Sequence, residues 1–131
     1  MAELEQTIPQ FRRRILVVDD NEDSAETLGM LLTLLGAEVR IAHDGLEALE
    51  IFDGYDPSVV FLDIGMPGMD GYEVARRIRT SYPDHRSVLV ALTGWGQRED
   101  CAKARAAGFN HHLVKPANIR ALENLTTLGT M

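Results

Sequence analysis

Three stretches of the chain, residues 15–18, 59–62 and 88–92, are continuously apolar and rich in β-branched side chains. This composition is typical of strands in a parallel sheet, which helices cover on both faces. Residues 38–42 alternate between polar and apolar side chains, which indicates an edge strand with one face in water. Residues 113–114 are a short fifth candidate. The pattern therefore predicts five strands.

Between these strands, apolar residues recur at helical spacing. The first such segment has Ala25, Leu28, Leu32 and Leu35 at intervals of three or four, and Gly36 follows as a C-cap. The next two helices are expected to begin with capping boxes, Asp44 to Glu47 and Asp70 to Glu73. The side chains expected to point inward from them are Ala48, Leu49 and Phe52 in one helix and Val74, Ile78 and Tyr82 in the other.

Two more helices complete the alternation. Residues 97–107 are rich in alanine and predict a lightly packed helix, and residues 118–128 predict a short last helix. Its apolar residues are Ile119, Leu122 and Leu125. Five strands that alternate with five helices indicate an α/β fold with a doubly wound five-stranded parallel sheet. In such sheets the ligand site lies outside the carboxyl ends of the strands.

Composition narrows the function classes. A length of 131 residues suits one domain. The balance of 13 Lys and Arg against 20 Asp and Glu gives a net charge of −7, which argues against direct binding of nucleic acid or of an anionic membrane. The one basic run, residues 12–14, is expected to be a solvated lead-in. No apolar run is long enough to span a bilayer, and the lone Cys101 favours a reducing cytoplasm.

Charged and polar side chains stand at the ends of four predicted strands. Asp19 and Asp20 end the first, Asp63 the third, Thr93 the fourth and Lys115 the fifth. Because carboxyl ends of parallel strands meet at one edge of the sheet, these residues are expected to converge.

Crowded carboxylates repel one another unless their pKa values rise or a cation joins them, and Mg²⁺ prefers such oxygen ligands. Asp63 can then act as a nucleophile toward a phosphoryl group and form an acyl phosphate. Mg²⁺, Lys115 and the Thr93 hydroxyl would each cover one of the three phosphoryl oxygens. The residues thus predict a phosphoryl-transfer site.

Four motifs give the chain a resemblance to the receiver domains of two-component response regulators. They are Ile15-Leu-Val-Val-Asp-Asp20, Phe61-Leu-Asp-Ile-Gly-Met-Pro-Gly-Met-Asp-Gly71, Ala91-Leu-Thr-Gly94 and Leu113-Val-Lys-Pro116. Together they cover roughly residues 13–126, in order and at the expected strand ends. The resemblance implies a flavodoxin-like sheet of order 2-1-3-4-5, with a lead-in at residues 1–12, the receiver domain at 13–128 and a tail at 129–131.

By position, Asp63 resembles the phosphoacceptor, which takes phosphate from a sensor histidine kinase or a histidine phosphotransfer protein. Asp20, Asp63 and the carbonyl of Gly65 resemble direct Mg²⁺ ligands, and Asp19 resembles the acid that holds the metal through water. The resemblance implies a signalling domain that catalyses its own phosphotransfer and dephosphorylation, and no enzyme acting on a separate substrate.

The remaining matches concern switching. Lys115 resembles the ion-pairing lysine, and the bond before Pro116 resembles the cis peptide of the family, which is accessible almost only before proline. On phosphorylation Thr93 would move inward, and the family's aromatic residue three positions before the lysine would follow. Here that residue is His112, which departs from the usual Phe or Tyr and adds a possible pH sensitivity. The face of residues 97–107, 113–114 and 118–128 would then signal to a downstream protein or to a second copy.

Three rival functions stay open. A phosphohydrolase of the haloacid dehalogenase type needs a second aspartate two residues after the nucleophile, where this chain has Gly65. A flavin-binding module needs a phosphate loop rich in Gly, Ser and Thr, where this chain has acidic residues 19–23. A pseudo-receiver would normally lack an acidic, Thr or Lys position, and all are present.

The other potentially reactive side chains have ordinary interpretations. His43, His85 and His111 lack the spacing of a metal site and are expected to face solvent or to bond locally. Cys101 is expected to be a small packing residue. Trp95 is the one tryptophan, and two hypotheses about it stay open. It is either a partly exposed loop aromatic or, together with Gly65, a residue that controls the access of water to the acyl phosphate. Kinase, target and oligomeric state do not follow from the sequence, and a stand-alone regulator and a fragment of a hybrid kinase both stay open.

Overall fold

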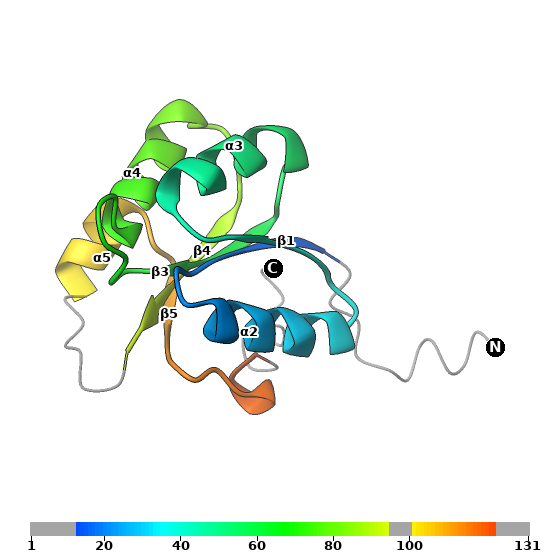
Figure 1. Ribbon diagram of the computed structural model, residues 1–131. Coiled ribbons are helices and arrows are strands. Elements are labelled where there is room, and N and C mark those ends of the chain that lie inside the picture. The colour runs from blue at the N-terminus through cyan, green and yellow to red at the C-terminus, as the bar shows by residue number, and fades with distance from the viewer. Residues whose placement is uncertain (1–12, 95–100, 123–131) are drawn as a thin grey trace.

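The computed structural model describes residues 13–94 and 101–122, and within them five strands form a single parallel sheet (Figure 1). The strand order is β2-β1-β3-β4-β5, which confirms the doubly wound topology expected from the sequence. The strands are β1 (Arg14–Val18), β2 (Glu38–Ala42), β3 (Val59–Asp63), β4 (Val88–Thr93) and β5 (His111–Val114).

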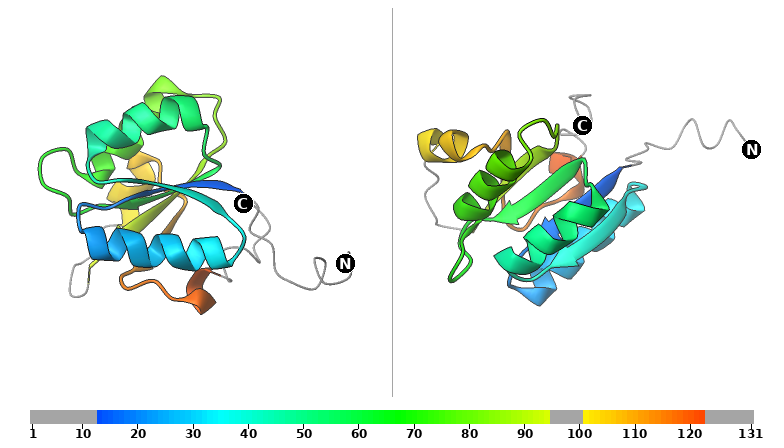
Figure 2. Two further views of the ribbon diagram at one scale, coloured as in Figure 1. Left: turned by 45° about the vertical axis from the view of Figure 1, so that its right-hand side comes forward. Right: turned by 90° about the horizontal axis from the view of Figure 1, so that it is seen from above.

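Helices connect successive strands and cover both faces of the sheet, as Figures 1 and 2 show. They are α2 (Glu22–Leu34), α3 (Gly45–Tyr55), α4 (Gly71–Ser81) and α5 (Cys101–Ala107), and residues 119–122 are also helical. Of the predicted helix at 97–107, residues 97–100 lie outside the described residues, as do 123–128 of the last helix. None of the described helices is long and apolar enough to cross a membrane.

The sheet separates two apolar cores. On one side, Leu16 and Val18 of β1 pack with Phe52 of α3 and Ile78 of α4. On the other side, Ile15 and Val17 pack with the inward residues of α2 and with Leu122. Alternate side chains of one strand point to opposite faces, so a strand buried between two helical layers must be apolar at every position. This explains the continuous apolar runs of β1, β3 and β4.

Local hydrogen bonds fix where α2 begins and ends. The Asn21 side chain accepts a hydrogen bond from the Ser24 amide at 2.9 Å, which caps the first turn. At the other end Gly36 adopts a φ of 95°, and the amide of Ala37 donates to the carbonyl of Leu32 at 3.0 Å. This is a Schellman ending, which needs a residue that tolerates positive φ, and it confirms Gly36 as the helix stop.

The two predicted capping boxes have different outcomes. In α3, Asp44 accepts from the Glu47 amide at 2.8 Å, while the Glu47 carboxylate reaches back to the amide of His43 at 2.7 Å. In α4, Asp70 accepts from the Glu73 amide at 3.0 Å, but the Glu73 carboxylate turns toward two arginines of its own helix. The second box was therefore wrong in its reciprocal half, because Glu73 has cationic partners three and four residues ahead.

The strand ends differ by a few residues from the apolar runs. β3 extends to Asp63 and β4 to Thr93, so both polar residues belong to the ladder. β5 begins at His111, two residues before the predicted start, because an edge strand does not need apolar side chains. β2 is the other edge, with Glu38 and Arg40 exposed, as its alternating pattern predicted. The predicted limits of the lead-in and the tail, at residues 12 and 128, lie outside the described residues.

Candidate functional site

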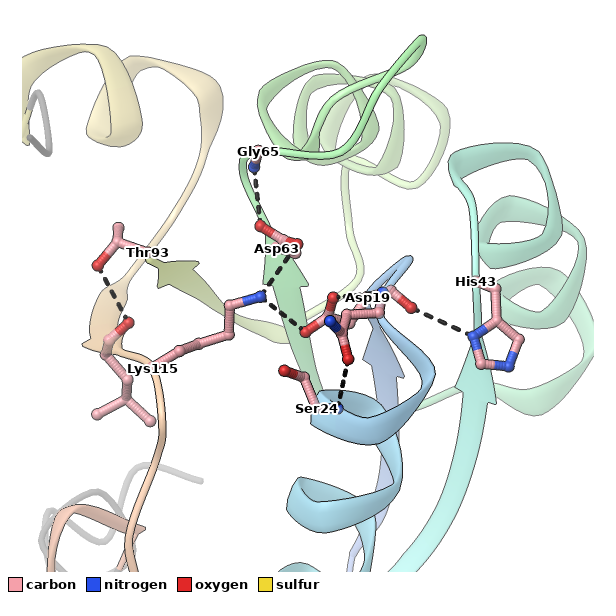
Figure 3. A network of polar contacts seen from close by, with 9 residues as sticks. Asp19, Ser24, His43, Asp63, Gly65, Thr93 and Lys115 are labelled. Atoms are coloured by element: carbon pink, nitrogen blue, oxygen red, sulfur yellow. Dashed lines mark hydrogen bonds and ion pairs between the residues drawn. The ribbon is translucent and has the colours of Figure 1, made fainter. Parts of the chain in front are cut away.

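The carboxyl ends of β1, β3, β4 and β5 bring the predicted site residues to one edge of the sheet (Figure 3). Asp19 directly follows β1, and Asp63 is the last residue of β3. Both are buried, with exposed fractions of 1% and 5%, although charged residues are rarely buried without partners. Their burial at a strand end therefore requires a counter-charge or a cation.

Lys115 supplies that counter-charge within the chain. Its ammonium lies 3.0 Å from a carboxylate oxygen of Asp19 and 3.2 Å from one of Asp63, so it bridges the ends of β1 and β3. The Lys115 side chain is 22% exposed. Burial by itself lowers the pKa of this ammonium, but its hydrogen bond to Asp19 and the two nearby negative charges outweigh burial and raise the pKa. Lys115 is therefore held in its charged form.

Backbone amides bind the other carboxylate oxygens. The Asn21 amide donates to Asp19 at 3.0 Å, and the Gly65 amide donates to Asp63 at 2.8 Å. Burial raises the pKa of Asp19, and the charge of Asp63 adds to this, although the hydrogen bonds from Asn21 and Lys115 act in the opposite direction. The two carboxylates are thus fixed in orientation by one amide each and by a shared ammonium.

Asp20 completes an acidic cluster. Carboxylate oxygens of Asp19, Asp20 and Asp63 all lie within 4.8 Å of one another, and Asp20 is exposed. Three hard oxygen donors on a partly open surface suit Mg²⁺, which uses few protein ligands and retains several waters. The donor set therefore fits the expected cation. Gly65, the fourth predicted ligand, is exposed next to Asp63 on the loop between β3 and α4.

Gly71, a residue that the sequence did not single out for the site, supports Asp63 from behind. A Cβ atom at position 71 would lie 2.5 Å from the carbonyl oxygen of Asp63 and 2.9 Å from the Cα of Ile64. Both are backbone atoms that cannot rotate away. The first turn of α4 can therefore approach the end of β3 this closely only with glycine. The sequence marks Gly71 as part of a turn, but the close approach depends on the packing of α4.

Thr93 points toward β5 rather than toward Asp63. It is buried, and its hydroxyl donates to the carbonyl of Leu113 at 3.4 Å, as Figure 3 shows. His112, the predicted switch residue, is exposed on β5. The Lys115–Pro116 peptide bond, which the resemblance led us to expect in the cis form, is cis. Thr93 and His112 are thus linked to the site through β5.

A small cleft of about 190 Å³ opens beside Lys115. Asp19 and Lys115 line it, together with Ser24 of α2 and Pro116 after β5. Asp19 is the one member of the carboxylate cluster that lines this cleft, so the cleft adjoins the site on the α2 side.

His43 is exposed, as expected, whereas His85 and His111 are half-buried. His43 lies near the site, where its Nδ1 is 3.2 Å from the backbone carbonyl of Asp19. His85 contacts the carboxylate of Asp56, 29 residues away along the chain, and its ring packs at a tilt against the ring of Phe52. Trp95 lies outside the described residues, and so do the two hypotheses about its role. The side chain of Cys101 is not described either.

The fold and the acidic edge define a class of α/β signalling domains, and comparison with known proteins identifies the family. Residues 15–127 match the family described as the response regulator receiver domain, so the chain belongs to that family. The chain is 38% identical over 119 residues to the virulence sensor protein BvgS of Bordetella bronchiseptica. It is 37% identical over 122 residues to the response regulator MprA of Mycobacterium ulcerans.

These relatives are longer than the chain. The match covers 87% of this chain but 10% of the Bordetella protein, and 88% of this chain but 52% of the mycobacterial regulator. Among solved structures, the Vibrio cholerae chemotaxis protein CheY4 is similar with a TM-score of 0.78 and 31% sequence identity. That match covers 88% of this chain and 95% of CheY4. Family membership decides against the phosphohydrolase and flavin-binding alternatives, whereas a pseudo-receiver shares the fold and is left for experiment.

Proposed function

We propose that this receiver domain accepts a phosphoryl group on Asp63. The observation that carries the proposal is the bridge of Lys115 between Asp63 and Asp19, inside a cluster of three carboxylates. A lysine that only screened two acids would serve stability alone. A lysine beside an oriented carboxylate and a cation site can also neutralise a phosphoryl group when one arrives.

Asp19, Asp20 and Asp63, with the Gly65 carbonyl, would hold Mg²⁺. When bound, the metal supplies positive charge for the phosphoryl oxygens, as in other phosphoryl-transfer sites. Asp20 is exposed, whereas the buried Asp19 is already bonded to Lys115. This agrees with Asp20 as a direct ligand and with Asp19 acting through water.

In the proposed reaction, a carboxylate oxygen of Asp63 attacks the phosphorus of a phosphohistidine on a sensor kinase or phosphotransfer protein. The P–N bond breaks, the imidazole keeps the electron pair and takes up a proton, and an acyl phosphate forms on Asp63. Lys115 stays within reach of the phosphoryl oxygens because it already contacts this carboxylate. Attack of water on the same phosphorus later returns the carboxylate and releases phosphate.

The Thr93 hydroxyl provides the output. In the structure it donates to the Leu113 carbonyl, and we propose that it exchanges this acceptor for a phosphoryl oxygen. β5 then loses one bond to β4, and the surface of α5, β5 and residues 119–122 changes, with His112 on it. That surface would bind a downstream protein or a second phosphorylated copy.

We infer that the domain works in a reducing cytoplasm as a phosphoacceptor module, without direct contact with nucleic acid or membrane. Support comes from the net charge of −7, the single cysteine and the family membership.

Intact mass measured after incubation with Mg²⁺ and acetyl phosphate tests the proposal. We expect a gain of about 80 Da, one phosphoryl group, that needs Mg²⁺ and is lost in Asp63→Asn. A folded protein that gains no mass from acetyl phosphate or from any histidine kinase would instead be a pseudo-receiver. Asp56→Asn, a change at an exposed aspartate away from the cluster, is the matched control and should gain the full mass.

A further inference from the structure

The outer edge of β2 has features that none of the phosphorylation chemistry uses. β2 is an edge strand of the sheet within the described residues. The amide of Glu38 donates to the carbonyl of Arg13, and the carbonyl of Ala42 accepts from the amide of Asp19, so these residues direct their peptide groups toward β1. Because the N–H and C=O groups of successive residues point to opposite sides of a strand, those of Val39 and Ile41 point away from β1. They form an open row of donors and acceptors.

The side chains of β2 divide between the two faces of the sheet. Glu38 and Arg40 are exposed on the α3 side, where the Arg40 guanidinium lies 5.5 Å from the ring centre of Tyr55. Val39 and Ile41 are half-buried on the α2 side, next to Gly29. The edge thus has one charged face and one apolar face.

The apolar face continues onto α2. Met30 and Leu34, one turn apart, are 67% and 74% exposed, and with Val39 and Ile41 they line a groove of about 570 Å³. Large apolar side chains this exposed beside an open strand edge are typical of surfaces that bind protein.

Charge decides which strand fits this edge. In an antiparallel pair of β2 strands related by a two-fold axis, outward peptide groups must face outward peptide groups. Centring the axis on Val39 makes the two Val39 residues a hydrogen-bonded pair and places Glu38 opposite Arg40 of the other copy, twice. If the axis is centred on Arg40, the Arg40 residues of the two copies lie opposite each other and repel. If it is centred on Glu38, the two Glu38 residues do the same. A centre at Ile41 pairs neither charge, so the Val39 register alone gives two attractive cross-strand pairs.

From this self-complementarity we propose that two copies of the chain associate through their β2 edges, as an antiparallel β2–β2 pair centred on Val39. Two five-stranded sheets join into one, with Glu38 and Arg40 of each copy paired across the α3 side. On the α2 side Met30 and Leu34 of both copies cover one another and the two Val39 side chains. This surface is separate from the α5 and β5 face and does not require phosphorylation.

Sedimentation velocity of the whole chain, unphosphorylated and at concentrations from about 1 μM to about 1 mM, tests the pairing. We expect a monomer–dimer equilibrium in the wild type. Glu38→Arg and Arg40→Glu each turn both attractive pairs into repulsive ones, so each should raise the dimer dissociation constant about tenfold or more. Circular dichroism confirms that each variant is folded, and Arg86→Glu, at an exposed position away from the edge, is the matched control.

The decisive measurements combine the two substitutions. An equimolar mixture of Glu38→Arg and Arg40→Glu should form a heterodimer, because each introduced charge then meets its opposite. The double variant Glu38→Arg with Arg40→Glu should dimerise like the wild type. A wild type that stays monomeric overturns the proposal. So does a dimer that both single variants leave unchanged, or a failure of mixture and double variant to restore association.

Discussion

The ammonium of Lys115 lies 3.2 Å from the Asp63 carboxylate, although 52 residues separate the two along the chain. The same ammonium contacts Asp19, which is 96 residues away. The ends of β1 and β3 are therefore connected through a residue that follows β5. Any change in charge on Asp63 must act on Lys115, and through it on the segment after β5, without a long chain of intermediates.

Replacing Lys115 with methionine should destabilise the domain in the absence of Mg²⁺. The variant leaves two buried carboxylates without their cation, and breaking such a pair costs about 2–3 kcal/mol when one partner is partly exposed. Urea denaturation monitored by circular dichroism measures the loss. Arg86→Met, at an exposed position, should change the free energy of unfolding by less than about 0.5 kcal/mol. Equal stability of Lys115→Met and the wild type would show that the bridge does not stabilise the fold.

Gly71→Ala should destabilise the domain by about 2–4 kcal/mol, because the new methyl group collides with backbone atoms of Asp63 and Ile64. Gly54→Ala in α3 is a matched control, since nothing lies within 4 Å of its added Cβ. In a helix this change should stabilise by about 0.5–1 kcal/mol. Chemical denaturation of both variants gives the comparison, and a neutral Gly71→Ala would mean that α4 can move away from β3 freely.

The sequence predicts the sheet because continuously apolar runs are buried on both sides only in the middle of a sheet that helices cover. It predicts where the acidic residues meet because they directly follow those runs. It does not predict which carboxylate oxygen binds which partner. Glu73 illustrates the limit: its spacing from Asp70 fits a capping box, but Arg76 and Arg77 compete for the carboxylate. The need for Gly71 depends on how closely α4 approaches β3, which no local pattern contains.

β5 shows a second limit. His111 and His112 lack the composition of a buried strand, and the pattern shortens β5 accordingly, whereas the ladder with β4 begins at His111. Backbone pairing at an edge imposes few demands on side chains, so its extent is weakly encoded. The same applies to Thr93, whose acceptor on Leu113 is visible only once β4 and β5 are placed side by side.

Mg²⁺ should raise the unfolding midpoint of the wild type, because the proposed Mg²⁺ site, the cluster of three carboxylates, exists only in the folded protein. At ten to a hundred times its dissociation constant, a ligand adds about 1.4–2.7 kcal/mol to the free energy of unfolding. Asp20→Asn should abolish this shift, because it removes the exposed member of the cluster. Asp23→Asn, three residues further along the chain and outside the cluster, should retain it. Thermal melts over a Mg²⁺ titration give the result, and equal shifts in all three proteins would place the ion elsewhere.

The Tyr55 phenol should titrate late. Burial and the charge of Glu38 raise its pKa to about 12, and its hydroxyl donates to the Glu38 carbonyl at 2.9 Å. A folded pKa above the unfolded value stabilises the fold below about pH 10, and this contribution is lost as pH rises through about 12. At a pH near 11 the tyrosinate absorbance of folded wild type and Tyr55→Phe should agree. In urea the absorbance of the two proteins should differ by that of one tyrosinate. The same difference in the folded proteins would contradict the raised pKa of Tyr55.

Thr93→Ala should uncouple phosphorylation from β5. In the wild type, we expect the hydroxyl to leave Leu113 for a phosphoryl oxygen, so amide resonances of residues 111–114 should shift when Asp63 is phosphorylated. The alanine variant lacks the hydroxyl in both states, so those resonances should stay near their unphosphorylated positions while intact mass still shows the phosphoryl group. Thr93→Ser keeps the hydroxyl and should respond like the wild type. Shifts of equal size in Thr93→Ala would mean that β5 senses Asp63 by another route, of which Lys115 is the nearest.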